Sequence, residues 1–185
     1  MASPLGHSMM GVAIFMATVK PAEWMKRWGW LLLLVFFSAA ADLDYIPALF
    51  GRFDLAEQFH RRFTHTLLFS ISSVTIYLLI AAAIERKFLW KDGLILMIAM
   101  VIHLVIDIAA QDEKEPRGIA PFEPFSKVRF YSPYVIFPNI NKGSFKAILS
   151  MHNVRVAIFE ILFFGILIII GAGFSLFLNY RKKAD

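Results

Sequence analysis

Long apolar runs constrain this 185-residue chain more than any other feature of its sequence. A helix needs about 20 mostly apolar residues to cross a bilayer. Four stretches meet or approach that length: Trp28–Ala41 (apolar on to Phe50), Thr66–Ile84, Gly93–Ala110 and Val154–Leu178. The chain is 58% hydrophobic and 18% charged, whereas soluble domains are roughly half apolar and a quarter charged. The sequence therefore predicts an all-α, polytopic transmembrane helical bundle.

A fifth apolar stretch, Leu5–Val19, is shorter and fits either a tilted span or a helix on the membrane surface. Counting it as a span, we expect about five membrane helices in a single membrane-embedded domain, residues 1–185. The connection between the last two spans, residues 112–153, is long and rich in Pro, Phe and Tyr. It is too apolar for a disordered linker, so we expect it to fold as a cap or interfacial segment.

When the membrane crossings of the chain are counted, polar residues that are distant in the sequence are predicted to lie at one face of the membrane. If the five spans alternate in direction, all five histidines fall on the side of the N-terminus, together with three aspartates that lie in apolar runs. Leaving aside His152, the residues of this group that could bind a metal are His7, Asp42, Asp44, His60, His65, His103 and Asp107.

The segment "HLVID", His103 to Asp107, places an imidazole and a carboxylate four residues apart within a span. Residues at this spacing share one face of a helix, so they could bind a single metal ion. An aspartate deep in a bilayer is costly and is normally paired and functional. The alternative is a His–Asp pair that satisfies itself within the bundle.

In "AADLDYIP", Asp42 and Asp44 are two residues apart, so a regular helix would point them in different directions. Pro47 disfavours helix at the residue before it. An unwound end would let both carboxylates face a shared site. The alternative is a hydrated helix end with Asp44 in water.

In "HRRFTH", Thr64 is a candidate N-cap for the next helix, with His60 and His65 on either side of it. Arg61 and Arg62 could donate forked hydrogen bonds to phosphate oxygens, and we expect them to steady the anionic oxygens of a substrate. The alternative is that these arginines flank the membrane and reach toward lipid headgroups.

The ligand chemistry follows from the residue types. The chain has no cysteine, so a metal would be held by imidazole and carboxylate groups. That donor set suits a divalent ion, with zinc favoured and manganese or iron as alternatives. Such an ion can activate a water molecule at neutral pH. The ligands outnumber the four of one zinc site, so they fit two metals or one metal with outer partners.

The distribution of basic residues predicts which side carries this group. The opposite side holds basic residues in short segments, namely Lys20, Lys26, Arg27, Arg86, Lys87, Lys91 and Arg181–Lys183. Short loops rich in Lys and Arg stay in the cytoplasm. We therefore expect the histidines on the extracytoplasmic face.

The ordered motifs "GHS", "DLD", "HRRFTHT" and "HLVID", followed by "GIAPFEPFS", resemble the YdjM-type family of inner-membrane metal-dependent hydrolases, whose members are also labelled LexA-binding. The resemblance runs roughly from His7 to Phe125. It implies a multi-pass protein of the cell inner membrane and a distant relation to zinc-dependent phospholipases C and zinc nucleases, which hydrolyse phosphoesters. It also implies that the seven residues named above carry the site. The chain departs from the family at Tyr45, where a histidine is common.

These observations lead to one main functional hypothesis and two rivals. We expect a membrane-bound metal-dependent hydrolase that acts on a phosphoester of a lipid or lipid-linked substrate through a metal-activated water. The first rival is a non-catalytic membrane protein with a structural metal that docks a soluble protein partner. The second is a metal or proton transporter, which the absence of Asp, Glu, His, Lys and Arg from Thr66–Ile84 disfavours. No direct nucleic-acid binding is expected.

Overall fold

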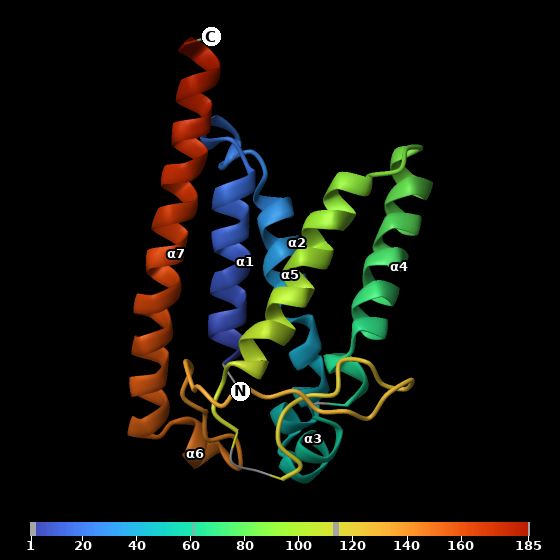
Figure 1. Cartoon of the computed structure of the whole chain (residues 1–185), viewed down its shortest axis with the longest axis vertical. Coiled ribbons are helices and arrows are strands. Elements are labelled where there is room, and N and C mark those ends of the chain that lie inside the picture. The colour runs from blue at the N-terminus through green and yellow to red at the C-terminus, as the bar shows by residue number, and fades with distance from the viewer. Residues whose placement is uncertain (1–2, 61, 113–114, 185) are drawn as a thin grey trace.

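The structure is a computed structural model that describes residues 3–60, 62–112 and 115–184. Every regular element in this described part is a helix (Figure 1). The elements are α1 (Pro4–Thr18), η1 (Pro21–Glu23), α2 (Trp28–Ala39), η2 (Ala40–Phe50), α3 (Phe53–Phe59), η3 (Phe63–His65), α4 (Leu67–Glu85), α5 (Trp90–Ile108), α6 (Phe145–Ile148) and α7 (Met151–Ala184), where η marks a 3₁₀ helix. The predicted all-α class is confirmed for these residues.

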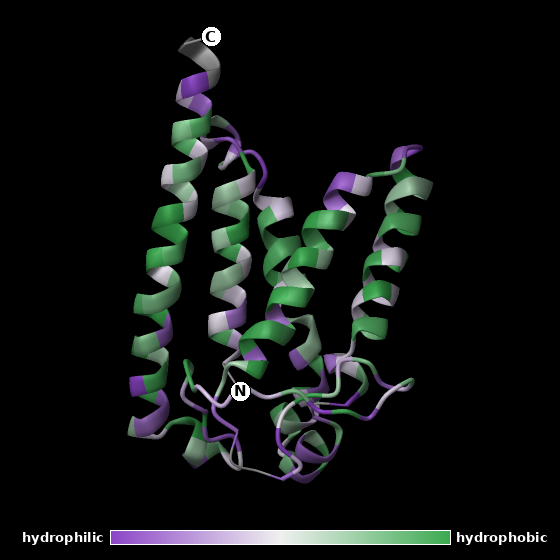
Figure 2. Ribbon diagram, in the orientation of Figure 1, coloured by the Kyte–Doolittle hydropathy of each residue, from purple (hydrophilic) through white to green (hydrophobic). Residues whose placement is uncertain are grey.

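The longer helices α1, α2, α4, α5 and α7 run along the long axis of the molecule, and α1 packs between α2 and α7 (Figure 1). The first described residues and the C-terminus lie toward opposite ends. Hydrophobic residues cover the middle of these helices, and hydrophilic residues gather at the two ends (Figure 2). Short helices α3 and α6 and the connection between α5 and α7 gather at one end, which we call the cap end.

Three helices of the described chain are long and apolar enough to cross a membrane, fewer than the five expected. They are α2 continued by η2, Trp28–Phe50 (23 residues), α4, Leu67–Glu85 (19 residues), and most of α7, Met151–Arg181 (31 residues). Helix α1 has only 15 residues, too few for an upright span. Helix α5 has 19 residues but includes Lys91, Asp92 and Asp107, and charged residues weaken the apolar character that a span needs.

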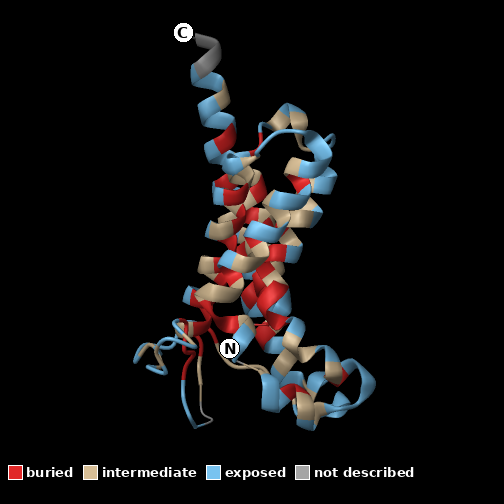
Figure 3. Ribbon diagram, turned by 90° about the vertical axis from the view of Figure 1, so that its right-hand side faces the viewer, coloured by how far each residue is buried: buried red, intermediate tan, exposed pale blue. Residues whose placement is uncertain are grey.

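Glycines bring α1 close to both of its neighbours. A Cβ atom at Gly11 would lie 2.8 Å from the backbone oxygen of Leu34 on α2, and one at Gly171 of α7 would lie 2.9 Å from the backbone oxygen of Ala13. Small residues at such contacts let helix backbones approach closely in membrane proteins. Buried residues run along the middle of the bundle and continue toward the cap end (Figure 3). The position of α1 is therefore fixed from two sides.

The connection between α5 and α7 folds against the cap end instead of extending away from it. Phe137 is buried and stacks on Phe164 of α7 with ring centroids 5.5 Å apart. The amide of Leu67, at the start of α4, donates to the carbonyl of Pro121 at 2.8 Å. Pairing within the described part of the connection is limited to isolated bridges, such as Ile119 with Phe130. Apolar contacts to α7 and a hydrogen bond to α4 thus hold this segment in place.

Candidate metal centre

Helix α5 supplies the central pair of the site. His103 and Asp107 lie one turn apart and are buried, and the distance from His103 Nε2 to Asp107 Oδ2 is 3.2 Å. The other ring nitrogen, Nδ1, lies 2.8 Å from the backbone oxygen of Ser38, near the end of α2. A carbonyl can only accept, so His103 Nδ1 carries the proton of this hydrogen bond, and Nε2 is the nitrogen that faces Asp107.

Two more imidazoles reach the same carboxylate from other helices. His7 of α1 places Nε2 3.3 Å from Asp107 Oδ1, and His65, just before α4, places Nε2 3.3 Å from Asp107 Oδ2. The rings of His7 and His103 stack with centroids 3.7 Å apart. Residues from α1, α5 and the start of α4 therefore converge on Asp107, as the crossing count predicted.

Asp42 and Asp44 approach His65 from its two ring nitrogens. Asp42 Oδ1 is 3.9 Å from Nε2, whereas Asp44 Oδ2 is 3.3 Å from Nδ1. We expected an unwound helix end here, but the chain stays helical. It tightens at Ala40 from α-helix into a 3₁₀ helix that contains Pro47, with three residues per turn. This change of pitch directs both carboxylates toward one imidazole.

The polar atoms at the centre of the site are buried and lack ordinary partners. Relative exposure is 0% for His7 and His65, 2% for His103, 3% for Asp107 and 8% for Asp42. Within the described part of the chain, both ring nitrogens of His7 and all carboxylate oxygens of Asp42 and Asp107 have no hydrogen-bond partner. A buried donor or acceptor without a hydrogen-bond partner costs roughly 1–3 kcal/mol. A cation bound among them would remove that cost.

The separations match the edges of a metal coordination shell. Ligands about 2.0–2.2 Å from a tetrahedral zinc ion lie about 3.3–3.6 Å from one another. The three contacts to Asp107 described above measure 3.2, 3.3 and 3.3 Å, and His103 Nε2 lies 3.5 Å from His65 Nε2. His7, His103 and Asp107 offer ligand atoms that all lie within 4.8 Å of one another. With His65 beside two of them, they could hold a divalent ion without a sulfur ligand. We call His7, His65, His103 and Asp107 the inner set.

His60 and Asp44 form a layer outside the inner set. His60 Nδ1 lies 2.9 Å from Asp44 Oδ1, and its Nε2 faces Lys142, with Nζ at 3.2 Å. Burial, helped by the charge of Lys142, outweighs Asp44 and lowers the pKa of His60 to about 4, so the ring is neutral at pH 7. His60 could still share an ion with Asp42 and His65, since ligand atoms of the three lie within 4.8 Å of one another. Its role as a direct ligand stays a prediction.

His65 behaves in the opposite way. Burial disfavours its charged form, but the carboxylates of Asp107 and Asp44 outweigh burial and raise the pKa of His65 to about 9. In the metal-free protein this ring is therefore protonated at neutral pH. A metal ion bound at Nε2 would displace that proton.

The structure describes only one of the two predicted arginines, and it places the N-cap of α4 at another residue than predicted. Arg61 lies outside the described residues, and Arg62 is exposed. The N-cap of α4 is Thr66, whose hydroxyl accepts from the Phe69 amide at 3.1 Å, so the prediction of Thr64 was wrong. Thr64 instead donates to Asp44 Oδ2 at 2.8 Å. The side chain best placed to cap was the one that directly precedes the helix, two residues beyond Thr64.

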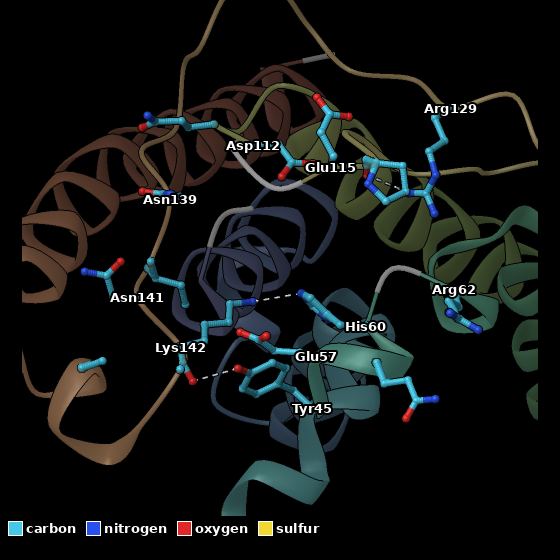
Figure 4. A pocket seen from close by; sticks show the side chains of 16 residues that line it. Tyr45, Glu57, His60, Arg62, Asp112, Glu115, Arg129, Asn139, Asn141 and Lys142 are labelled. Carbon is cyan, nitrogen blue, oxygen red and sulfur yellow. Dashed lines mark hydrogen bonds between the residues drawn. The ribbon is translucent and has the colours of Figure 1, made fainter. Parts of the chain in front are cut away.

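A polar cavity of about 560 Å³ lies in front of His60 at the cap end (Figure 4). Its lining includes Tyr45, Arg62, Arg129 and Lys142 from four separate segments. Figure 4 shows Lys142 and Tyr45 beside His60, with Arg62 farther along the rim. The sequence offered no signal for Lys142, because nothing in a long connection without regular repeats fixes where one lysine will lie.

A buried carboxylate of α7 supports the position of His7 through the first residue of the described chain. Glu160 of α7 is buried and accepts from the backbone amide of Ser3 at 2.7 Å and from its hydroxyl. Ser3 is the N-cap of α1, and the amide of His7 donates to its carbonyl at 3.2 Å. An ionisable residue within an apolar run was the available signal, but its partner could not be read from the sequence.

Comparison with known families bears on the whole chain. A family model described as YdjM inner membrane protein matches residues 1–179. A search of curated proteins and a search of solved structures each found no match. The resemblance drawn from the motifs is therefore confirmed at the level of the family.

Proposed function

This chain belongs to the YdjM inner membrane protein family, and from that premise we propose that it is a membrane-bound metal-dependent hydrolase. Its proposed substrate is a phosphoester of a lipid or lipid-linked molecule. The observation that carries the proposal is the convergence of His7, His65 and His103 on the carboxylate of Asp107 at distances of 3.2–3.3 Å.

A divalent ion held by this set would act as a Lewis acid and lower the pKa of a water molecule bound to it, to about 7 in known zinc enzymes. The residues of the chain prepare that chemistry. The carbonyl of Ser38 fixes the tautomer of His103, and Asp44 orients the rings of His60 and His65. Arg62, on the rim of the cavity, is proposed to steady anionic oxygens of the substrate.

The place of the site in the bundle supports a substrate from the membrane. The inner set lies toward the cap end, where hydrophilic connections replace the apolar middle of the helices (Figure 2). A lipid headgroup occupies this depth in a bilayer. We propose that α1 and α5, which pack on the candidate spans α2, α4 and α7, also lie within the membrane. The chain would then cross five times, with the cap end on the extracytoplasmic face.

One observation favours a second candidate function. Each member of the inner set is at most 3% exposed, and closed sites without an open position are typical of structural metals. A non-catalytic protein that holds a structural metal and docks a soluble partner is therefore the alternative. It requires the metal for stability and predicts no turnover.

Hydrolysis assays on metal-loaded protein separate the two candidates. Purified protein would be loaded with zinc, manganese or iron and offered a chromogenic phosphodiester and phospholipids in mixed micelles. The hydrolase predicts turnover that a chelator abolishes and that His103→Ala reduces at least about 100-fold, since loss of an outer partner alone typically costs 10–100-fold. Asp92→Ala, at the far end of the same helix, should keep its activity. Metal binding without turnover on any ester would favour the structural alternative.

A further inference from the structure

The cavity in front of His60 differs from the buried inner set because it is open to solvent and many of its lining residues are polar. It measures about 560 Å³, within the roughly 300–1,000 Å³ of small-molecule sites, so it has room for more than a phosphate group. Besides its cations, its lining includes the amides Asn139 and Asn141 and the carboxylates Glu57, Asp112 and Glu115 (Figure 4). Amides and charges of both signs suit a hydroxyl-bearing polar group better than an acyl chain.

We propose that this cavity binds the phosphorylated, hydroxyl-bearing headgroup of the substrate, with Lys142 as the cation that contacts its phosphoryl oxygens. The inference rests on the proposed function and names the part of the substrate that the cavity takes. It adds Lys142 to the cationic contacts that the sequence suggested for Arg61 and Arg62.

Among the described cations of the cavity lining, Lys142 contacts His60. Its Nζ lies 3.2 Å from His60 Nε2 and 5.0 Å from the centroid of the Tyr45 ring. Within the described part of the chain, no carboxylate forms an ion pair with it. Arg129 instead donates to the carbonyl of Gly118 at 2.6 Å, and Arg62 is exposed on the rim. Of the three, Lys142 is both charged and available beside His60.

The backbone that carries Lys142 is held on two sides. The hydroxyl of Tyr45 donates to its carbonyl at 2.9 Å. On the other side, the Asn153 side chain of α7 accepts from the amide of Asn141 at 2.8 Å and donates to its carbonyl at 2.9 Å. His152 Nε2 lies 2.9 Å from the carbonyl of Asn139. The start of α7 and η2 together place Lys142, so its position is built into the fold.

A short chain of contacts links the cavity to the inner set. His60 on the cavity wall contacts Asp44 at 2.9 Å, and Asp44 contacts His65 at 3.3 Å. A headgroup bound at Lys142 therefore lies one imidazole and one carboxylate away from the inner set. Lysine serves as a point charge toward phosphate, and a single charge-assisted contact of this kind is worth at least about tenfold in affinity.

Binding of glycerol 3-phosphate to zinc-loaded protein in detergent, measured by calorimetry, tests the inference. We expect Lys142→Ala to weaken binding at least about tenfold and Lys142→Arg to stay within about threefold of the unmodified protein. The matched control is Lys146→Ala, an exposed lysine of α6 outside the cavity lining, which should bind normally. Zinc content measured on each variant ensures that a loss reflects the cavity and not the metal centre.

Two probes identify the source of the headgroup. Inorganic phosphate and phosphatidylglycerol in mixed micelles would compete against glycerol 3-phosphate. Stronger displacement by the lipid supports a lipid headgroup, whereas stronger displacement by free phosphate overturns it. Equal binding by Lys142→Ala and the unmodified protein would also overturn the inference. If phosphodiesters are hydrolysed but Lys142→Ala binds normally, the headgroup inference is wrong and the proposed hydrolase function still stands. If Lys142 binds the probe but no ester is cleaved, the proposed hydrolase function is wrong and binding of the headgroup in the cavity still stands.

Discussion

Asp44 contacts two imidazoles at once, His60 at 2.9 Å and His65 at 3.3 Å, and so orients a ligand without lying in the inner set. Carboxylates that orient metal-bound histidines typically contribute 10–100-fold to metal affinity. We predict that Asp44→Asn lowers zinc affinity by about that factor, measured by competition with a chromophoric chelator. Asp54→Asn, an exposed aspartate paired with Arg52, is the control. Unchanged affinity in Asp44→Asn would contradict the orientation of His65 described above.

The raised pKa of His65 gives the metal-free protein a pH dependence. Because the folded-state pKa is about 9 and the ordinary value is 6.5, protonated His65 stabilises the metal-free fold fully below pH 6.5. That stabilisation is lost as the pH rises through 9. Zinc must displace the same proton, so apparent zinc affinity should increase over this interval. Thermal unfolding of metal-free protein at several pH values checks the first effect, and chelator competition checks the second. A stability that rises from pH 6.5 to 9 would be the wrong sign.

Helix α7 offers a matched pair of glycines. A Cβ at Gly171 would lie 2.9 Å from the backbone oxygen of Ala13 on α1, whereas one at Gly173 would meet nothing within 4 Å. Overpacking typically costs 1–3 kcal/mol, so we predict that Gly171→Ala lowers thermal stability and weakens zinc binding by displacing His7. Gly173→Ala should be neutral or stabilising, because alanine favours helix by about 1 kcal/mol. Equal melting temperatures for the two variants would refute close packing of α1 on α7.

Local spacing predicted some elements of the site and could not predict others. The four-residue spacing of His103 and Asp107 lies within one helix, so its geometry follows from the sequence. Pro47 predicted that Asp42 and Asp44 would converge, but the physical cause was a change to a 3₁₀ helix and not unwinding. Lys142 and Glu160 act across 82 and 157 positions of sequence, respectively. Contacts of that range depend on tertiary packing, which periodicity does not encode.

For the molecule as a whole, hydropathy alone predicts some of the membrane spans, and others depend on tertiary contacts. Hydropathy identified α2, α4 and α7, which alone are long and apolar enough among the described helices. Helix α1 is short, and α5 carries the aspartate of the site. Both pack against the candidate spans. This packing can shield the polar and charged side chains of α1 and α5 from the lipid. The proposal that α1 and α5 also lie in the membrane therefore rests on contacts as well as on hydropathy.

Orientation in the membrane can be tested because the chain has no cysteine. Met25, between α1 and α2, is 91% exposed, and Leu149, between α6 and α7, is 82% exposed. These positions lie at opposite ends of the molecule (Figure 1). We predict that an impermeant maleimide labels Leu149→Cys in intact cells and labels Met25→Cys only after lysis, because short basic loops stay in the cytoplasm. The reverse pattern would place the cap end in the cytoplasm.

The central claim, that the inner set binds a metal ion, is tested most directly by elemental analysis of the purified protein. The protein would be loaded with zinc, manganese or iron and then dialysed. The account predicts at least about one equivalent of bound metal in the unmodified protein and in Asp92→Ala, and almost none in His103→Ala or Asp107→Ala. Equal metal content in Asp107→Ala and the unmodified protein, or no metal in any sample, would contradict it.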